Sequence, residues 1–322
     1  MSKICIGIPC YNEEANLEEL YNELKKMMVR DLPEYDYEFL FVDNKSKDHS
    51  RQILRSLCQQ DSRVKAIFNR VNCGPNTNAF FVLQQSDGDC TILLCADFQE
   101  PLEMIPTMVK KWEEGNKVIC MIKTESEENK LVYLAREVFY RVFKSMSDVD
   151  QIKQYTGFGL YDKSFLDIIR NIKDNTPCVK GIVAEYAPDR LEIPYKQRLR
   201  KGGHSSLNFM GYYDSAMLSF TSYTRSGLRA LTFFGGAFSI FGFIMAIVYL
   251  IRKLMYWNDF TTGNAPILIC VLFFGGCELM FLGIMSEYIL NINKRVLDRP
   301  MVVVEEKINF ECEQEDNNRW IY

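Results

Sequence analysis

The stretch LLCADFQEPLE, residues 93–103, begins as a buried strand and ends in a group of polar side chains. Its leading leucines are apolar, whereas Asp97, Gln99 and Glu100 follow within a few positions. Carboxylate and amide oxygens are the hard ligands that Mg²⁺ and Mn²⁺ prefer. We therefore expect Asp97 and Gln99 to hold a divalent ion, and the dipeptide Glu100-Pro101 to begin the next helix.

Strand and helix signals alternate on either side of this stretch. Amphipathic segments with apolar residues at helical spacing predict helices over 14–28, 50–60 and 102–114. This βαβα alternation predicts an α/β fold with a Rossmann-like, mainly parallel sheet and helices on both faces. Short apolar runs rich in strand-forming residues predict the strands, at 3–10, 37–44, 64–69, 90–98 and 117–123.

Three of these predicted strands end in polar clusters, namely 9–14, 42–50 and 95–101. Helix capping by Asn12 or Asp48 explains part of this pattern. Because ligands bind at the carboxyl ends of parallel strands, the convergence of three clusters predicts a binding site there.

The kind of ligand is narrowed by the motifs that the sequence lacks. Neither a G-x-G-x-x-G turn nor a G-x-x-x-x-G-K-[ST] loop occurs, which argues against a dinucleotide-binding dehydrogenase and a P-loop NTPase. A nucleotide at these strand ends would instead be held by carboxylates and a divalent ion. Glu13 and Asp43 could accept hydrogen bonds from base N–H groups or ribose hydroxyls.

The composition of the chain argues against several other classes of protein. The net charge of −4 over 322 residues does not indicate a nucleic-acid partner. Eleven cysteines without metal-finger spacing indicate reduced thiols in the cytosol, and two histidines argue against a histidine zinc site. The N-terminus lacks the features of a signal peptide, so we expect the strand-rich part to be cytosolic.

Two apolar runs near the C-terminus predict a transmembrane hairpin. Residues 231–251 carry no charge, and residues 265–290 are interrupted only by Glu278 and Glu287. Basic residues outside the hairpin predict that both termini are cytosolic, in a multi-pass protein of the cytoplasmic membrane. A buried helix pair in a soluble protein is the alternative. A carboxylate inside a span is costly, so we expect Glu278 to be paired or functional.

The chain resembles glycosyltransferase family 2, which has the GT-A fold. IPCYNEEANL (8–17), FVDNKSKDHS (41–50) and CADFQEP (95–101) match its signature segments in order and spacing. TGFGLYDKSFLD (156–167) and IPYKQRLRKGGHSS (193–206), followed by the hairpin, resemble the membrane-bound polyprenyl-phosphate glycosyltransferases, which include dolichyl-phosphate mannose synthase. The resemblance runs over nearly the whole chain.

The resemblance implies an inverting enzyme that moves one sugar from a UDP- or GDP-sugar to undecaprenyl or dolichyl phosphate, for cell-envelope glycan or glycoconjugate assembly. Mg²⁺ or Mn²⁺ is the implied cofactor, held by Asp97 and Gln99, and Asp97 and Arg200 would be catalytic. The implied nucleotide-sugar ligands are Pro9, Tyr11, Glu13, Asp43 and Asp97, and the implied acceptor-phosphate ligands are Arg198, Arg200, Lys201 and Ser205.

The sequence departs from the family pattern at four positions. Cys95 replaces the first aspartate of the D-x-D motif, Asn44 and Lys45 replace an aspartate and a glycine, and Ser206 stands where a lysine is common. These departures leave metal affinity and donor choice open. We interpret Cys95 as a packed thiol at a strand end rather than as a soft metal ligand.

These interpretations divide the chain into a catalytic domain (1–206), interfacial amphipathic helices (207–229), the transmembrane pair (230–292) and a cytosolic tail (293–322). The acidic part of the tail would be a peripheral or subunit-contacting extension. A different lipid or glycan acceptor, or a non-catalytic membrane-anchored scaffold, are the alternative functions. The donor sugar, its base and the oligomeric state, including a possible homo-oligomer, stay open.

Overall fold

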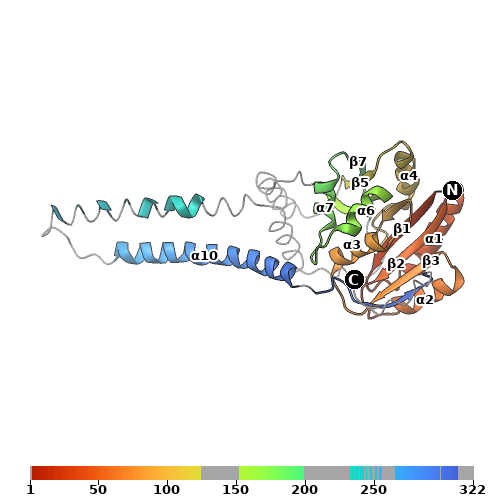
Figure 1. The fold of residues 1–322 in the computed structure, drawn as a ribbon, viewed down its shortest axis with the longest axis horizontal. Helices are drawn as coiled ribbons and strands as arrows, with labels where there is room; N and C mark the ends of the chain where they lie inside the picture. Colours follow the sequence, from red (N-terminus) through yellow and green to blue (C-terminus); the bar gives the residue numbers. More distant parts are fainter. Residues whose placement is uncertain are drawn as a thin grey trace.

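The computed structural model describes residues 2–124, 152–198, 265–297 and 299–310, together with parts of 233–255. An eight-stranded sheet forms the centre of the molecule, with strand order β7-β5-β6-β4-β1-β2-β3-β8 (Figure 1). The strands are β1 (Lys3–Cys10), β2 (Asp36–Asp43), β3 (Val64–Asn69), β4 (Cys90–Leu93), β5 (Val118–Lys123), β6 (Tyr155–Asp162), β7 (Leu191–Tyr195) and β8 (Val304–Ile308).

The predicted helices are confirmed, with shifted ends for two of them. The one expected over 102–114 opens with a 3₁₀ turn, Leu102–Met104, before α4. A helix over Pro75–Gln85 was not predicted, because its apolar residues are consecutive and Phe80, Phe81, Val82 and Leu83 are all fully buried. The helices of the sheet domain are α1 (Leu17–Asp31), α2 (Ser50–Gln60), α3 (Pro75–Gln85), α4 (Ile105–Glu113), α6 (Lys163–Asn171) and α7 (Val179–Tyr186).

Helices cover both faces of the sheet, as the alternating pattern predicts. Apolar residues of α1, α2 and α4 form one core cluster with the sheet, and those of α3, α6 and α7 form the other. Gly7 of β1 permits the close approach of α3, since a Cβ there would lie 2.4 Å from Cγ1 of Val82.

The sheet is mixed, with four parallel strand pairings, including that of β5 with β7, and three antiparallel ones. β1 pairs in parallel with β2 and β4, and β2 with β3, which gives the parallel centre that the sequence predicts. β6 runs antiparallel to both β4 and β5, and β8 runs antiparallel to β3. The chain leaves β1 toward β2 and β3 and returns to β4 on the other side of β1. Such a change of direction leaves a crevice at the carboxyl ends of β1 and β4, where α/β sheets bind ligands.

The last described part of the chain is an integral part of this sheet. β8 pairs with β3 in a register that runs from Ala66–Ile308 to Asn69–Val304. The amide N–H of Arg70 also donates to the carbonyl of Val303 at 2.8 Å. The predicted peripheral extension therefore begins as an edge strand, and a catalytic domain ending at residue 206 omits this strand.

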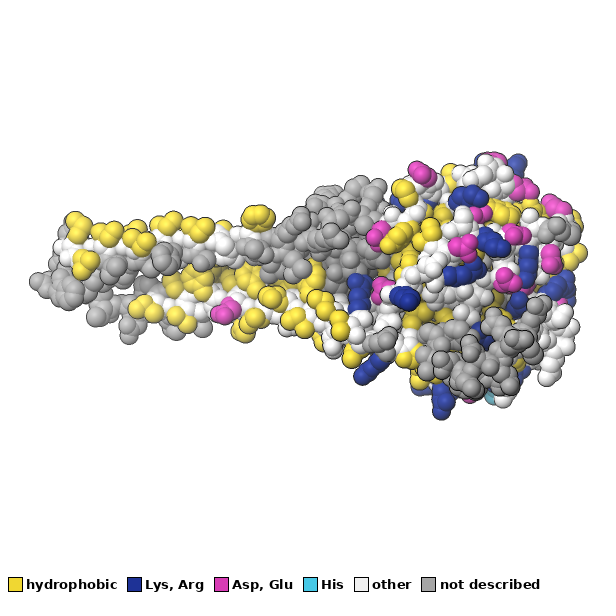
Figure 2. Space-filling model, viewed as in Figure 1, with side chains coloured by type: hydrophobic (Ala, Val, Ile, Leu, Met, Phe, Trp, Pro, Cys, Tyr) yellow, Lys and Arg dark blue, Asp and Glu magenta, His cyan; other side chains and the backbone are white. Residues whose placement is uncertain are grey.

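A long apolar helix, α10 (Ala265–Val296), projects from the sheet domain (Figure 1). Within it, Phe273–Asn293 is long and apolar enough to cross a bilayer, and no other helix in the described parts of the chain meets that test. Hydrophobic side chains line α10 and the neighbouring described residues of 233–255, while charged side chains gather on the sheet domain (Figure 2).

The predicted first span, 231–251, is described only in part, as a shorter apolar helix over Phe233–Gly242. Its Phe238 ring lies 6.1 Å from that of Phe273 and 6.2 Å from that of Phe274, so this segment packs beside α10. The predicted interfacial helices, 207–229, lie outside the described residues.

Candidate functional site

The loops that follow β1 and β2 are joined by reciprocal hydrogen bonds. The amide N–H of Asn12 donates to Oγ of Ser46 at 2.9 Å, and Oδ1 of Asn12 accepts from the amide of Lys47 at 2.8 Å. The hydroxyl of Ser50 accepts from the amide of Glu13 at 2.9 Å. Asn12 therefore ties the two loops together instead of capping α1, and it adopts a left-handed φ of 55° to do so.

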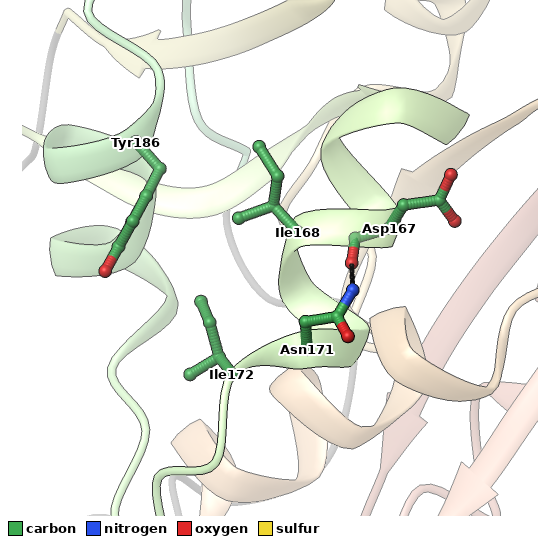
Figure 3. Close-up of a pocket in the computed structure, with 5 residues that line it drawn as sticks. All are labelled: Asp167, Ile168, Asn171, Ile172 and Tyr186. Atoms are coloured by element: carbon green, nitrogen blue, oxygen red, sulfur yellow. Dashed lines mark hydrogen bonds between the residues drawn. The ribbon is translucent and has the colours of Figure 1, made fainter.

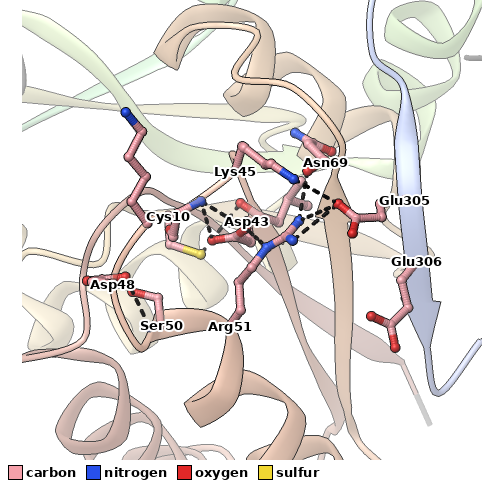
Figure 4. Close-up of polar contacts among 12 residues, drawn as sticks. Cys10, Asp43, Lys45, Asp48, Ser50, Arg51, Asn69, Glu305 and Glu306 are labelled. Carbon is pink, nitrogen blue, oxygen red and sulfur yellow. Dashed lines mark hydrogen bonds and ion pairs between the residues drawn. The ribbon is translucent and has the colours of Figure 1, made fainter.

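Asp43, at the end of β2, has no exposed surface. Its Oδ2 accepts from Nε of Arg51 at 2.8 Å, and from the amide of Ser46 at 3.2 Å (Figure 4). A buried carboxylate needs such partners, because an unpaired charge away from water is costly.

Arg51 lies on the first turn of α2 and is itself held from several sides. One terminal nitrogen donates to the carbonyl of Asn69 at 2.8 Å, and both terminal nitrogens lie 3.2 Å from Oε2 of Glu305. Nζ of Lys45 reaches the same oxygen of Glu305 at 3.2 Å (Figure 4). Four charged groups, two of each sign, thus surround the end of β2.

The other residues predicted for the nucleoside pocket lie near Asp43. Glu13 is 8% exposed and accepts from Nδ2 of Asn16 at 2.7 Å, while Tyr11 is half-buried. Burial raises the pKa of the Cys10 thiol well above its usual value, and the carboxylates of Asp43 and Glu13 raise it further. Both carboxylates are therefore close enough to Cys10 to act on it through space.

Strand β4 ends at Leu93, earlier than the sequence predicts, and the polar cluster occupies a loop. The amide of Leu94 still donates to the carbonyl of Gly7 at 3.1 Å, which keeps the loop beside β1. Oδ1 of Asp97 accepts from the amide of Gln99 at 3.2 Å, and Phe98 between them has a φ of 59°.

Glu100 is buried beneath this loop, where it accepts hydrogen bonds, and it does not begin a helix. Oε2 of Glu100 accepts from the amide of Cys95 at 2.7 Å, and Oε1 accepts from the hydroxyl of Thr156 on β6 at 3.3 Å. Burial raises the pKa of Glu100 to about 8, against the opposing effect of the Cys95 hydrogen bond. The predicted role in starting the helix is wrong for Glu100; its carboxyl clamps the loop to β6, and the 3₁₀ turn begins after Pro101.

Cys95 is exposed, so its interpretation as a packed strand-end thiol is wrong. The strand ends before Cys95, and Glu100 occupies the buried position under the loop.

The donor atoms in this loop fit a magnesium or manganese ion that is shared with a substrate. Among the described residues, no group of three or more His, Cys, Asp or Glu side chains could hold a metal by itself. Mg²⁺ in phosphate-transfer sites is bound through one or two carboxylates plus waters and substrate phosphates. The carboxylate of Asp97 and the amide oxygen of Gln99 match that donor set.

The basic segment after β7 begins beside this loop. The amide of Arg198 donates to the carbonyl of Gln99 at 2.9 Å, and its guanidinium pairs with Glu103 at 2.5 Å. The other predicted acceptor ligands lie outside the described residues, namely Arg200, Lys201 and Ser205.

Asn44 stands where the family pattern has an aspartate, and the structure shows what the amide does. Its Oδ1 accepts from the amide of Cys73 at 2.9 Å, and its Nδ2 donates to Oδ1 of Asn72 at 3.1 Å and to the carbonyl of Gly74 at 3.3 Å. A carboxylate could accept but not donate here. Asn44 therefore organises the turn that precedes α3.

A shallow pocket of about 420 Å³ lies elsewhere, between α6 and α7 (Figure 3). None of the residues predicted for donor, metal or acceptor binding lines it. Its walls are Asp167, Ile168, Asn171, Ile172 and Tyr186.

Sequence reasoning missed Arg51, Glu305 and Thr156. Arg51 follows the second motif directly, and an arginine on the first turn of the helix after a strand that ends in aspartate is a sequence signal that could have identified it. Glu305 and Thr156 reach the site only through strand pairing, which no local pattern records.

Comparisons with known proteins identify the family of this chain. Residues 5–167 match the sequence profile described as glycosyl transferase family 2. An uncharacterized glycosyltransferase of Bacillus subtilis (strain 168), YkcC, is 30% identical over 307 residues, covering 95% of this chain and 94% of that protein. The SfII prophage-derived bactoprenol glucosyl transferase of Shigella flexneri is 26% identical over 304 residues, covering 94% of this chain and 97% of that protein.

Among solved structures, glucosyl-3-phosphoglycerate synthase from Mycobacterium tuberculosis, in complex with Mn²⁺, UDP-glucose and phosphoglyceric acid, aligns with a TM-score of 0.49 at 14% identity. That alignment covers 68% of this chain and 78% of the other. The match to the profile and the relative at 30% identity establish the family: this chain belongs to glycosyl transferase family 2.

Proposed function

We propose that this protein is a membrane-bound, metal-dependent, inverting glycosyltransferase. It would move a single sugar from a UDP- or GDP-sugar to a polyprenyl phosphate, such as undecaprenyl or dolichyl phosphate, at the cytosolic face of the membrane. The product would serve cell-envelope glycan or glycoconjugate assembly. The name of the bactoprenol glucosyl transferase relative supports the polyprenyl acceptor.

The observation that carries this proposal is that the loops after the neighbouring parallel strands β1 and β4 leave the same edge of the sheet. The loop after β1 carries Glu13 and is tied to the loop that follows the buried Asp43, and the loop after β4 carries Asp97 and Gln99 and is joined to β1 by the hydrogen bond from Leu94 to Gly7. The first pair suits the N–H and hydroxyl donors of a nucleoside, with Pro9 and Tyr11 as further walls. The second pair suits a divalent ion, which would neutralise the diphosphate of the donor.

The acceptor would be held on the far side of the metal loop. The hydrogen bond from Arg198 to Gln99 brings the start of the basic segment to that loop. We assign Arg198, Arg200, Lys201 and Ser205 to the lipid phosphate, because arginine binds phosphate bidentately and serine can donate to it. Arg200 would be the catalytic member, since it would bring the attacking phosphate to the donor.

The reaction needs no general base from the protein. A lipid phosphate is anionic at neutral pH, so its oxygen can attack the anomeric carbon directly as the bond to the nucleoside diphosphate breaks. The protein then has to position two anions in line and neutralise their charge. In-line attack inverts the configuration at the anomeric carbon.

The path of the chain favours two membrane spans. β1 and β8 belong to one sheet, so the residues before and after α10 lie on the same side of any membrane that α10 crosses. A chain that returns to its starting side crosses an even number of times. The segment containing Phe238, which packs against Phe273 and Phe274, is the natural second span. Both termini would then be cytosolic.

Transfer to another lipid or to a glycan is the second candidate within the same chemistry. A non-catalytic scaffold is the alternative from another class of protein. Cys95 and Asn44 favour this alternative, because each stands where the family pattern has an aspartate. The presence of Asp97, Gln99 and the Asp43 cluster argues against it.

The test is to incubate membranes containing the full-length protein with labelled UDP- or GDP-sugars and either undecaprenyl or dolichyl phosphate. We expect a labelled glycolipid that forms only with Mg²⁺ or Mn²⁺ and has inverted anomeric configuration. An Asp87→Asn variant, changed at an exposed carboxylate, serves as the matched control. If no sugar reaches either lipid and no nucleotide stabilises the protein, the enzyme proposal is wrong.

A further inference from the structure

Strand β8 carries two neighbouring glutamates that each pair with an arginine of α2. Oε2 of Glu305 lies 3.2 Å from the terminal nitrogens of Arg51, and Oε2 of Glu306 lies 2.6 Å from a terminal nitrogen of Arg55. The two glutamate side chains are equally accessible, with 41% and 40% of their surface exposed. They differ in what their arginine touches next, and Glu305 also pairs with Lys45.

Arg51 connects Glu305 to the buried carboxylate of the nucleoside site. Its Nε donates to Asp43 at 2.8 Å, and a terminal nitrogen donates to the carbonyl of Asn69 at 2.8 Å. Because the guanidinium is a rigid planar fork, a partner on each edge fixes its orientation. Arg55 and Arg51 both lie over the ring of Phe68, with 4.6 Å and 5.3 Å from the guanidinium carbon to the ring centroid, but the ion pair of Arg55 joins it to Glu306 and not to Asp43.

Lys45 gives Glu305 a second link to the same place. This lysine stands two residues after Asp43 with a left-handed φ of 64°, and its Nζ lies 3.2 Å from Oε2 of Glu305. A left-handed φ is unfavourable for a non-glycine residue and persists only where the surroundings enforce it. Burial alone would raise the pKa of Glu305, but hydrogen bonds from Lys45 and Arg51 outweigh it and lower that pKa. Glu305 is therefore ionised at neutral pH.

We propose that Glu305 is a positioning residue for the nucleoside end of the donor. It holds Arg51 and Lys45 so that the Asp43 carboxylate keeps a fixed orientation and a lone pair for a ring N–H of the base. The proposal rests on the proposed function, and it makes β8, the strand that follows the membrane helix, part of the donor site.

The charge arrangement gives the direction of the effect. Without the Glu305 carboxylate, two cations remain beside one buried carboxylate, and both can turn toward it. They then compete with the base for the oxygens of Asp43, which weakens donor binding. The reacting atoms at Asp97 are untouched, so the turnover rate of the bound complex stays nearly constant.

The experiment compares full-length protein with Glu305→Gln and with the matched control Glu306→Gln. Each change removes one charge from β8 and breaks one ion pair to α2, and Glu305→Gln also breaks the pair with Lys45. Calorimetric titration with UDP and with GDP gives Kd and stoichiometry, thermal unfolding without nucleotide gives Tm, and sugar transfer gives KM and kcat. For the nucleotide that the unmodified protein binds, we expect Glu305→Gln to raise Kd and KM roughly 3- to 10-fold, a change typical of one lost polar contact. Glu306→Gln should keep Kd within about twofold of the value for the unmodified protein, and its Tm should be similar to that of Glu305→Gln.

Several outcomes would overturn this inference. Equal shifts in Kd for the two variants, or none, would show that β8 only supports the fold. A reduced stoichiometry with unchanged Kd would mean that Glu305→Gln unfolds part of the protein without altering the site. A Glu305→Asp variant that binds no better than Glu305→Gln would also count against it, because a carboxylate restores the charge. If the unmodified protein binds neither UDP nor GDP, the proposed function itself fails, and that result is separate from a difference between variants.

Discussion

The amide N–H of Arg198 donates a hydrogen bond of 2.9 Å to the carbonyl oxygen of Gln99. Residues separated by about half of the soluble domain thereby meet at the loop that we assign to the metal. In the proposed function this contact places the acceptor-binding segment directly beside the diphosphate of the donor. The predictions below test the two loops and the contacts that hold them.

Asp97→Ala should abolish sugar transfer while the protein stays folded. The variant removes the one carboxylate that the loop offers to a divalent ion, and with it the means of neutralising the leaving diphosphate. Sugar transfer across a Mn²⁺ titration and thermal unfolding are the measurements, with Asp87→Ala as the control. Transfer at nearly the unmodified rate would refute the metal assignment.

Cys95→Ala should retain most of the activity, within about twofold, because a thiol is a poor ligand for hard ions such as Mg²⁺. Since Cys95 is exposed, the change also creates no cavity. Transfer rates with Mg²⁺ and Mn²⁺ check this prediction. A variant that no longer depends on metal would show that the thiol is a ligand.

Asn44→Asp should destabilise the protein, although it restores the residue that is usual in the family. The carboxylate cannot donate to Asn72 or to the carbonyl of Gly74, and it adds a charge next to the buried Asp43. Loss of a buried hydrogen-bond donor costs about 1–3 kcal/mol. Denaturant unfolding measures this cost, and Asn22→Asp, at an exposed position of α1, is a suitable comparison. An unchanged or higher stability would contradict the role given to the amide.

Asp61→Asn should lower stability at neutral pH and have little effect in acid. Hydrogen bonds from Arg63 hold the pKa of Asp61 well below its usual range against the opposing effect of burial, and Lys25 adds a further hydrogen bond. A depressed pKa contributes stability above the unfolded value of about 3.9 and loses it as the pH falls.

The loss at pH 7 should be about 1–2 kcal/mol, since the carboxylate is buried but its cations are partly exposed. Unfolding measured from pH 7 down to about pH 2 should show the difference in unfolding free energy narrowing below about pH 5 and closing only as the pH approaches the depressed pKa of folded Asp61. The exposed pair of Asp31 with Arg30 provides the control, and Asp31→Asn should change stability much less. If the difference in unfolding free energy between the unmodified protein and Asp61→Asn stays constant with pH, the lost stability does not come from the charge of Asp61.

The sequence by itself determined the α/β fold class and the sheet edge at which the candidate residues lie. The central strands and the helices of one face have strong local periodicity, so their existence could be predicted, and strand direction then places 9–14, 42–50 and 95–101 at one edge. The helix α3 escaped prediction, because its buried apolar residues, Phe80 to Leu83, are consecutive and show no helical period.

Only the tertiary structure decided what several polar residues do. Glu100 has the sequence context of a helix start, yet pairing of β4 with β6 brings Thr156 against it and makes it a buried clamp. Cys95 has the context of a packed strand end, yet the strand stops before it and leaves it exposed.

The contact between Arg51 and Glu305 spans 254 positions and exists because β8 pairs with β3. Periodicity and capping act over a few residues, whereas charge pairing and burial act between segments that only the folded chain brings together.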